Sequence, residues 1–177
     1  MNGKTLNTRH GELTLRTVRP SDAGPLRALR LEALITCPTI FGSVPEELDS
    51  INWNDQATNG AGAGDQALFV VERAGELVAV AGVVRNTRPK TKHAAFIWGV
   101  YVKPAFRGAR LAETMVNACV DWARERGVSI VRLTVVVGND KAIACYQRCR
   151  FETTGTDVAA IRSDGVDYDE YLMSRRV

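Results

Sequence analysis

The feature that most restricts the fold is a run of nine apolar residues at 94–102, AAFIWGVYV, the longest uninterrupted apolar stretch in the chain. A strand without a polar face must be covered on both sides, as at the centre of a sheet. A membrane-spanning helix needs about 20 apolar residues. The run therefore predicts a central strand, and we expect no transmembrane segment.

The remaining composition fits one soluble globular domain. The chain has 177 residues and a mass of 19.4 kDa, with 45% apolar and 24% charged residues, which excludes global disorder. Its first 16 residues contain neither an apolar segment nor a small-residue cleavage site of a signal peptide. We therefore expect a single domain over 1–177, located in the cytoplasm.

Hydrophobic periodicity and turn residues predict strands alternating with helices. Ser21 and Asp22 offer an N-cap to the first helix, Asn139 to the last, and Gly75 marks a hairpin turn. Strands are predicted at 12–16, 67–73, 77–85, 94–102, 129–137, after 151 and at 168–173, and helices at 23–35, from about 45, 107–127 and 140–150. This order predicts an α/β (α+β) fold: a mixed, mostly antiparallel central sheet of about six to seven strands flanked by about four helices.

The four cysteines, Cys37, Cys119, Cys145 and Cys149, lack the C-x₂-C spacing of a zinc or thioredoxin-type site. We expect reduced thiols that pack in the core, and no metal site.

The predicted helix at 107–127 begins without a capping residue. Its first turn, Arg107, Gly108, Ala109 and Arg110, adds two cations where the macrodipole is already positive. Small residues let a ligand approach free backbone N–H groups, so this strand-loop-helix junction predicts a phosphate site. The alternative is a surface helix with a poor cap.

Two motifs in this order resemble the GNAT superfamily of acyl-CoA-dependent N-acyltransferases. The segment VKPAFRGARLA at 102–112 is similar to the family's V-x-P and [RQ]-x-x-G-x-[GA] pattern, and NDKAIACYQRCRF at 139–151 to N-x-x-A-I-x-x-Y-x-x-x-G-F. The chain departs from the family in having Arg110 and Arg150 where glycine is usual. Since arginine is sterically allowed in a helical first turn, we expect the Arg110 amide to donate as usual, and Arg150 to alter only the helix end.

The resemblance implies that acetyl-CoA binds in a V-shaped opening between the strands at 94–102 and 129–137. An amine would attack the thioester directly, without a metal or a covalent enzyme intermediate, and the backbone near Val100 would hold the oxyanion. The implied cofactor-binding residues are Val100, Val102, Arg107, Gly108, Ala109, Arg110, Leu111, Ala112, Asn139, Ala142 and Tyr146.

Tyr146 is the catalytic residue that the resemblance implies, as the general acid for the leaving thiolate. A phenol of pKa near 10 gives its proton to a thiolate of pKa near 8.5 at a cost of about 2 kcal/mol, so hydrogen-bond stabilisation or a lowered pKa is favoured over simple donation. Core packing is the alternative role. The general base stays open among Glu46, Glu47, His93, Asp169, Glu170 and a water relay.

Charge along the chain is segregated, although the net charge is only +3. Seven acids and no bases occupy 31–72, nine bases and three acids 85–126, and six acids and one arginine 152–170. This pattern suits one anionic and one cationic ligand. The resemblance implies that these are acetyl-CoA and a small-molecule or peptide amine, and we expect no nucleic-acid or membrane partner. Ordinary solvated surface is the alternative. A non-catalytic acyl-CoA sensor of the same fold is the second functional hypothesis, and the acceptor, the acyl chain and the oligomeric state, a homodimer included, stay open.

Overall fold

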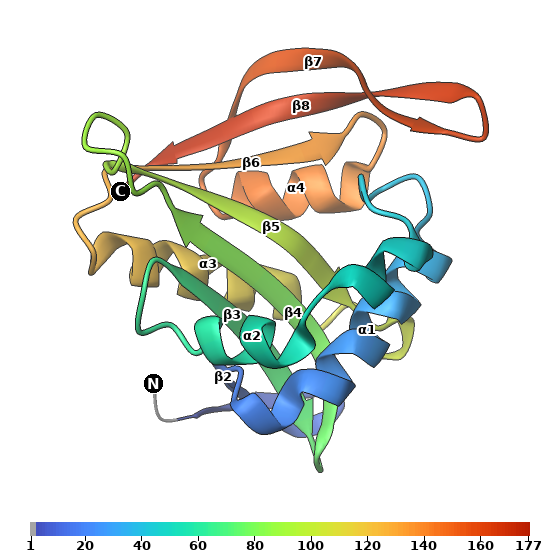
Figure 1. The fold of residues 1–177 in the computed structure, drawn as a ribbon, viewed down its shortest axis with the longest axis vertical. Coiled ribbons are helices and arrows are strands. Elements are labelled where there is room, and N and C mark those ends of the chain that lie inside the picture. The colour runs from blue at the N-terminus through green and yellow to red at the C-terminus, as the bar shows by residue number, and fades with distance from the viewer. Residues whose placement is uncertain (1–2) are drawn as a thin grey trace.

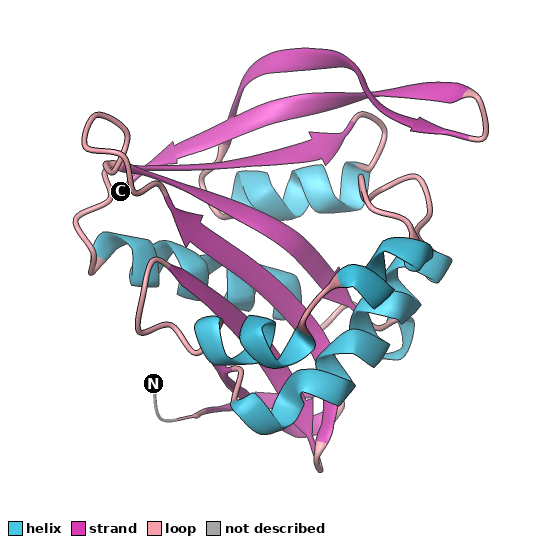
Figure 2. Cartoon of the chain, viewed as in Figure 1, coloured by secondary structure: helices cyan, strands magenta, loops and turns pink. Residues whose placement is uncertain are grey.

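An eight-stranded sheet runs through the molecule, and helices cover both of its faces (Figure 1, Figure 2). The computed structural model describes residues 3–177. The strands are β1 (Lys4–Thr8), β2 (Gly11–Thr17), β3 (Gln66–Arg73), β4 (Glu76–Arg85), β5 (Ala94–Val102), β6 (Ile130–Val136), β7 (Glu152–Ser163) and β8 (Val166–Arg176). The helices are α1 (Ala23–Thr36), α2 (Trp53–Asn59), α3 (Leu111–Arg124) and α4 (Asp140–Arg148), with 3₁₀ turns η1 (Pro20–Asp22), η2 (Pro45–Ser50) and η3 (Pro104–Phe106).

The strand order is β1-β2-β3-β4-β5-β6-β8-β7, and every neighbouring pair is antiparallel except β5 and β6. The predicted fold class is confirmed, with one strand more than expected. The additional strand is β1, which the sequence analysis did not predict. The helix expected near Pro45 is instead a 3₁₀ turn followed by α2. Among the described residues, no helix is long and apolar enough to cross a membrane.

Two hydrophobic clusters lie on opposite faces of the sheet. Phe69, Ile97 and Met115 belong to the larger cluster, which lies under α3 and α4. Leu29 and Tyr101 belong to the smaller one, under α1. Strand β5 contributes buried residues to both clusters, but Phe96 is 37% exposed, so the expectation that both faces are covered holds only in part.

Strands β5 and β6 separate toward their C-terminal ends. They pair only from Ala94–Ile130 to Phe96–Arg132, after which β6 continues along β8. The register of β5 on β4 shifts between Val80 and Gly82, opposite Gly99, whose φ of +63° suits glycine. A bulge of this kind bends the strand that carries it. The second half of β5 is therefore left without a partner on its β6 side.

The start of α1 differs from the prediction. Asp22 does not cap the helix, because its carboxylate accepts hydrogen bonds from the guanidinium of Arg16 at 2.6 and 3.0 Å. It also accepts from the Arg19 N–H at 2.7 Å. The second partner of Arg16 is Glu72 of β3, so a buried ion cluster joins β2, β3 and the beginning of α1.

Candidate functional site

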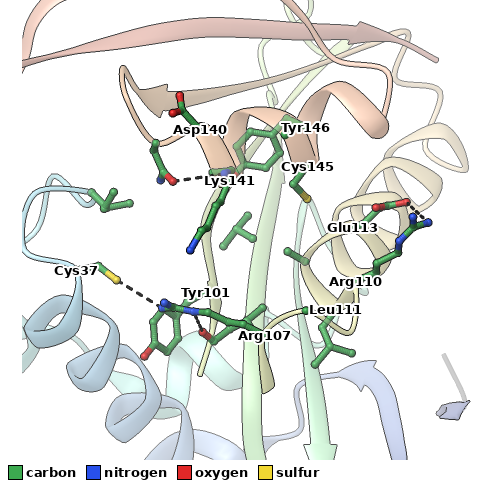
Figure 3. A pocket seen from close by; sticks show the side chains of 18 of the residues that line it. Cys37, Tyr101, Arg107, Arg110, Leu111, Glu113, Asp140, Lys141, Cys145 and Tyr146 are labelled. Carbon is green, nitrogen blue, oxygen red and sulfur yellow. Dashed lines mark hydrogen bonds and ion pairs between the residues drawn. The ribbon is translucent and has the colours of Figure 1, made fainter. Parts of the chain in front are cut away.

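A cavity of about 790 Å³ opens where β5 separates from β6 (Figure 3). Its walls come from the end of β5, the turn before α3, the first half of α4 and the segment after α1 that contains Cys37 and Phe41. Every residue predicted to bind the cofactor lines this cavity except Ala109. The structure thus brings together two motifs that lie about 30 residues apart in the chain.

The turn before α3 differs from the prediction, because the helix begins at Leu111 rather than at Arg107. Gly108 has a φ of +80°, and Arg107 is extended. The Arg107 N–H donates to the Pro104 carbonyl at 3.2 Å and is therefore already engaged. Within the described chain, the N–H groups from 108 to 113 donate to no acceptor. These free donors at the positive end of α3 can hold an anion such as a pyrophosphate.

Arg110 lies outside the helical first turn where we expected it. It is the N-cap residue of α3, with a left-handed φ of +55°, and its side chain makes no capping hydrogen bond. The position needs a positive φ, which is the physical reason for a glycine in the family motif. Arg150 follows the end of α4 with a φ of +64°, the conformation for which glycine is usual at this position.

Arg9, in the turn between β1 and β2, is a residue of this site that the sequence analysis missed. Its Nη2 donates to the Arg107 carbonyl at 2.5 Å, and a Cβ added to Gly108 would lie 2.6 Å from the same nitrogen. The alternation of Leu6, Leu13 and Leu15 around the turn glycine Gly11 is the signal that could have predicted this hairpin. Arg9 therefore stabilises the Arg107–Gly108 turn from the side of the β1–β2 hairpin.

The side chain of Arg107 lies across one end of the cavity (Figure 3). Its Nε donates to the Val102 carbonyl at 3.1 Å, and Nη2 lies 3.9 Å from the Cys37 Sγ. The carbonyl of Val102, one of the residues implied to bind the cofactor, thus already accepts one hydrogen bond. Arg107 would have to give up this contact, or share it, when a ligand lies along β5.

Tyr146 lines the cavity from α4, and only 8% of its surface is exposed. Its ring packs edge-on against Phe151, with 6.3 Å between centroids, while its hydroxyl has no hydrogen-bond partner among residues 3–177. Burial, helped by nearby thiols and Glu170, raises the pKa of Tyr146 well above its usual value. The lowered pKa considered above is therefore wrong, and hydrogen bonding by a neutral phenol remains.

The candidates for the general base lie in different places. His93 precedes β5 at the end away from the cavity, about 25 Å along the strand. The Asp169 carboxylate already accepts from the Ala159 N–H at 2.9 Å. Glu46 and Glu47 are exposed on η2. The structure therefore does not bring these four residues together at Tyr146.

Glu170 is the candidate whose surroundings favour proton transfer. It lies on β8 opposite Val136, near the end of β6. Burial raises the pKa of Glu170, Asp157 on β7 adds to the rise, and a hydrogen bond from Thr134 opposes it. Its charge also acts on the phenol of Tyr146. A half-buried carboxyl with a raised pKa is a better proton acceptor than an exposed one.

Folding partly undoes the charge segregation along the sequence. Lys103 pairs with both Glu32 and Glu76, at 3.2 and 2.6 Å, and Arg85 pairs with Asp65 at 2.5 Å. Among the described acids of the two acidic stretches, those without an ion pair within 4.0 Å are Glu46, Glu47, Asp55, Glu152, Asp157, Asp164, Asp169 and Glu170. The free negative charge is therefore carried by η2, α2 and the β7–β8 hairpin.

The cysteines are distributed between the core and the cavity. All four cysteines are free; Cys119, Cys145 and Cys149 are buried, as predicted, while Cys37 is half-buried at the cavity. Across residues 3–177 no group of three or more His, Cys, Asp or Glu side chains is arranged to hold a metal ion.

Comparison with known proteins identifies relatives along nearly the whole chain. Residues 30–151 match the model of the acetyltransferase (GNAT) family. The L-amino acid N-acetyltransferase AaaT of Escherichia coli K12 is 26% identical over 168 residues, 93% of this chain and 98% of that protein. The L-2,4-diaminobutyric acid acetyltransferase of Streptomyces coelicolor is 35% identical over 74 residues, 41% of this chain and 44% of that protein.

A solved structure shows the same fold. The putative acetyltransferase yncA of Salmonella typhimurium, determined with its cofactor acetyl-CoA, superimposes with a TM-score of 0.78 at 17% identity. The match covers 93% of each chain. The family of the matching model is the one that the two sequence motifs indicate.

Proposed function

Because the chain belongs to the acetyltransferase (GNAT) family, we propose that it transfers the acetyl group of acetyl-CoA to a primary amine of a small molecule within a single domain. The observation that carries the proposal is the row of free N–H groups at 108–113, which faces a cavity that also contains Tyr146. Acetyl transfer from acetyl-CoA needs a group that binds the phosphates and a hydrogen-bond donor for the leaving sulfur, and this cavity contains both.

The turn before α3 would hold the pyrophosphate of acetyl-CoA through the free N–H groups from Gly108 to Ala112. Arg107 and Arg110 add positive charge beside these donors, and Arg9 keeps the Arg107–Gly108 turn in shape. Asn139 accepts from the Ala142 N–H at 3.4 Å and so fixes the first turn of α4 at the opposite wall. The pantetheine would lie along the unpaired half of β5, beside Val100 and Val102.

For the acid–base steps we assign Glu170 and Tyr146. Glu170 takes a proton from the ammonium form of the acceptor, either directly or through water, so that the free amine attacks the thioester carbonyl. As the carbon–sulfur bond of the tetrahedral intermediate breaks, the Tyr146 hydroxyl donates a hydrogen bond to the leaving sulfur. The second proton of the attacking nitrogen passes to the thiolate or to water, which yields the amide and the CoA thiol. The raised pKa values of both groups fit these roles, because Glu170 accepts a proton more readily and Tyr146 stays neutral.

The class of acceptor follows from the relatives and from the free charge on the surface. Two of the relatives are an L-amino acid acetyltransferase and a diamino acid acetyltransferase by name. Unpaired acids on η2 and on the β7–β8 hairpin suit a protonated amine. We therefore propose a small cationic or zwitterionic amine as the acceptor.

Release of the CoA thiol from acetyl-CoA, measured across polyamines, aminoglycosides, amino acids and peptide amines, tests the proposal. Gly108→Val should raise the KM for acetyl-CoA, because a positive φ strains valine and its side chain would displace Arg9. Gly75→Val is the matched control: it has a φ of +88° in the β3–β4 turn, away from the cavity.

Two results would contradict the proposal. Binding of acetyl-CoA without thiol release for any amine would favour the sensor hypothesis. An unchanged KM for acetyl-CoA in folded Gly108→Val protein would mean that the pyrophosphate binds elsewhere.

A further inference from the structure

Helix α1 carries an arginine on its apolar face. Arg30 follows Leu26 by four residues and precedes Leu34 by four, so all three point to the same side of the helix. The guanidinium lies over the ring of Phe41, 4.6 Å from its centroid. Within residues 3–177, Nη1 of Arg30 is the buried side-chain nitrogen or oxygen that has no hydrogen-bond partner.

Arg30 is half-buried, and a buried nitrogen of its guanidinium without a hydrogen-bond partner is unfavourable and calls for an explanation. Neighbouring cations do have partners: Arg27 pairs with Asp49 at 2.6 Å, and Lys103 pairs with Glu76 at 2.6 Å. Glu47 attracts Arg30 at longer range, but the two form no ion pair within 4.0 Å. Arg30 is thus prepared for an anion that the described chain does not supply.

The position of Arg30 indicates which anion this is. Its Nη1 lies 3.8 Å from the point where a side chain on Gly99 would begin. The next residue, Val100, lines the cavity at the place implied for the thioester carbonyl, and Phe41 lines the same cavity. An anion on Arg30 would therefore lie close to the carbon that the amine must attack.

We propose that Arg30 binds a carboxylate of the acceptor, and that the acceptor is an amino acid whose carboxylate sits on the carbon bearing the reacting amine. This proposal rests on the proposed acetyl transfer. The planar guanidinium matches a carboxylate with two parallel hydrogen bonds. In an α-amino acid one carbon separates the two groups. Arg30 lies behind the residues that line the cavity, so its side chain would turn past Gly99 to reach the carboxylate. Glu46 and Glu47 on η2 would suit a second ammonium group. A diamino acid would therefore offer a carboxylate to Arg30 and an ammonium group to these two acids.

The test compares the best amino acid acceptor of a panel that includes L-2,4-diaminobutyrate with the carboxamide of the same compound. Wild-type protein should have a lower KM for the acid than for the amide. Arg30→Gln should raise the KM for the acid about 10- to 100-fold and leave the KM for the amide unchanged. Arg30→Lys should restore part of the difference, because an ammonium supplies charge without the planar fork. Arg27→Gln, which loses an exposed surface pair on the same helix, is the matched control.

Equal KM values of the wild type for acid and amide would overturn the proposal, and this comparison needs no variant to fold. Acetylation restricted to amines without a carboxylate would overturn it too. So would an Arg30→Gln protein that loses activity equally with acid and amide, because Arg30 would then be structural. Failure of every amine to release CoA thiol would instead reject the proposed acetyl transfer itself.

Discussion

At the scale of single residues, Tyr146 is a neutral hydrogen-bond donor held in place by packing. Its hydroxyl has no partner among the described residues and its pKa is raised by burial, so the phenol stays protonated over the working pH range. Such a group can stabilise a leaving thiolate without giving up its proton.

Tyr146→Phe should lower kcat about 10²-fold and leave the KM for acetyl-CoA nearly unchanged, as expected for an interaction made mainly in the transition state. Steady-state kinetics of thiol release measure both constants. Tyr168→Phe, on β8 and outside the cavity lining, controls for the loss of a hydroxyl. Full activity of Tyr146→Phe would reduce the residue to a packing role.

The two arginines at glycine positions of the family motif form a matched pair. Arg110 and Arg150 have φ values of +55° and +64°, which cost an L-residue about 1–2 kcal/mol. Glycine removes this strain but adds chain entropy, so each Arg→Gly change should stabilise the fold by about 0.5–1 kcal/mol. Arg110→Gly alone should also raise the KM for acetyl-CoA at low salt, because only Arg110 lines the cavity.

Urea unfolding and the KM for acetyl-CoA in the two glycine variants check this prediction. Equal KM changes in both variants would show that the Arg110 side chain adds nothing to phosphate binding.

Residue-level roles were predictable only where a local motif carries them. Tyr146 and Asn139 follow from one motif, and the structure places both at the cavity. Arg9 and Arg30 could not be recognised in this way, because the residues that place them at the site, Arg107 and Gly99, lie 98 and 69 residues away. For Arg30 the sequence does hold a hint, a charge among the buried leucines of an amphipathic helix.

At the scale of elements, hydrophobic periodicity predicts every strand except β1. The other differences are the helix expected near Pro45, which is a 3₁₀ turn, and the ends of predicted elements. The predicted helix at 107–127 begins four residues before α3, whose first residue is Leu111. Gly108 and Arg110 have positive φ values, which a hydrophobic pattern does not reveal. Similarly, the bulge at Gly99 depends on the pairing of β5 with β4. Both unpredicted features shape the cavity.

The ion cluster of Arg16, Asp22 and Glu72 joins β2, β3 and the beginning of α1. The side chains of Arg16 and Asp22 are only 5% and 10% exposed. Asp22→Asn removes one of the two negatively charged partners of the buried Arg16 guanidinium. It should lower the free energy of unfolding by about 3–5 kcal/mol. Asp49→Asn, which breaks the exposed pair with Arg27, should change it by less than about 1 kcal/mol.

Acid should remove the contribution of Asp22. Burial would raise the pKa of this carboxyl, but hydrogen bonds from Arg16 and the Arg19 N–H outweigh burial and hold it below its usual value. The stabilisation is therefore present above the unfolded-state pKa of about 3.9 and is lost as the pH falls through the lower folded-state pKa. Between pH 7 and pH 3, the free energy of unfolding measured in urea should fall more in wild type than in Asp22→Asn. Parallel losses would mean that Asp22 is not ionised in the fold.

At the scale of the whole molecule, the two faces of the sheet would give the two proposed ligands separate approaches. The turn before α3 and α4 lies on the face of the larger cluster, whereas η2 and α1 lie on the other face (Figure 1). Strands β5 and β6 separate between these faces, so a thioester held from one side can meet an amine from the other. The family resemblance implies such an opening, and the early end of the β5–β6 pairing agrees with it.

The unpaired acids of η2 and of the β7–β8 hairpin lead to a prediction about acceptor kinetics. They should attract a protonated amine, so kcat/KM for the acceptor should fall as ionic strength rises and the Debye length shortens to about 8–10 Å at physiological salt. The same field stabilises the ammonium form, and Glu170 accepts a proton only above its own raised pKa. Activity should therefore increase toward alkaline pH, and Glu170→Gln should lower kcat and flatten this increase. Initial rates at about 20 mM and about 500 mM salt, where the Debye length is roughly 20 Å and roughly 4 Å, measure the first effect. Initial rates between about pH 6 and pH 10 measure the second. A preferred acceptor that is neutral or anionic, with rates independent of salt, would mean that these carboxylates only solvate the surface.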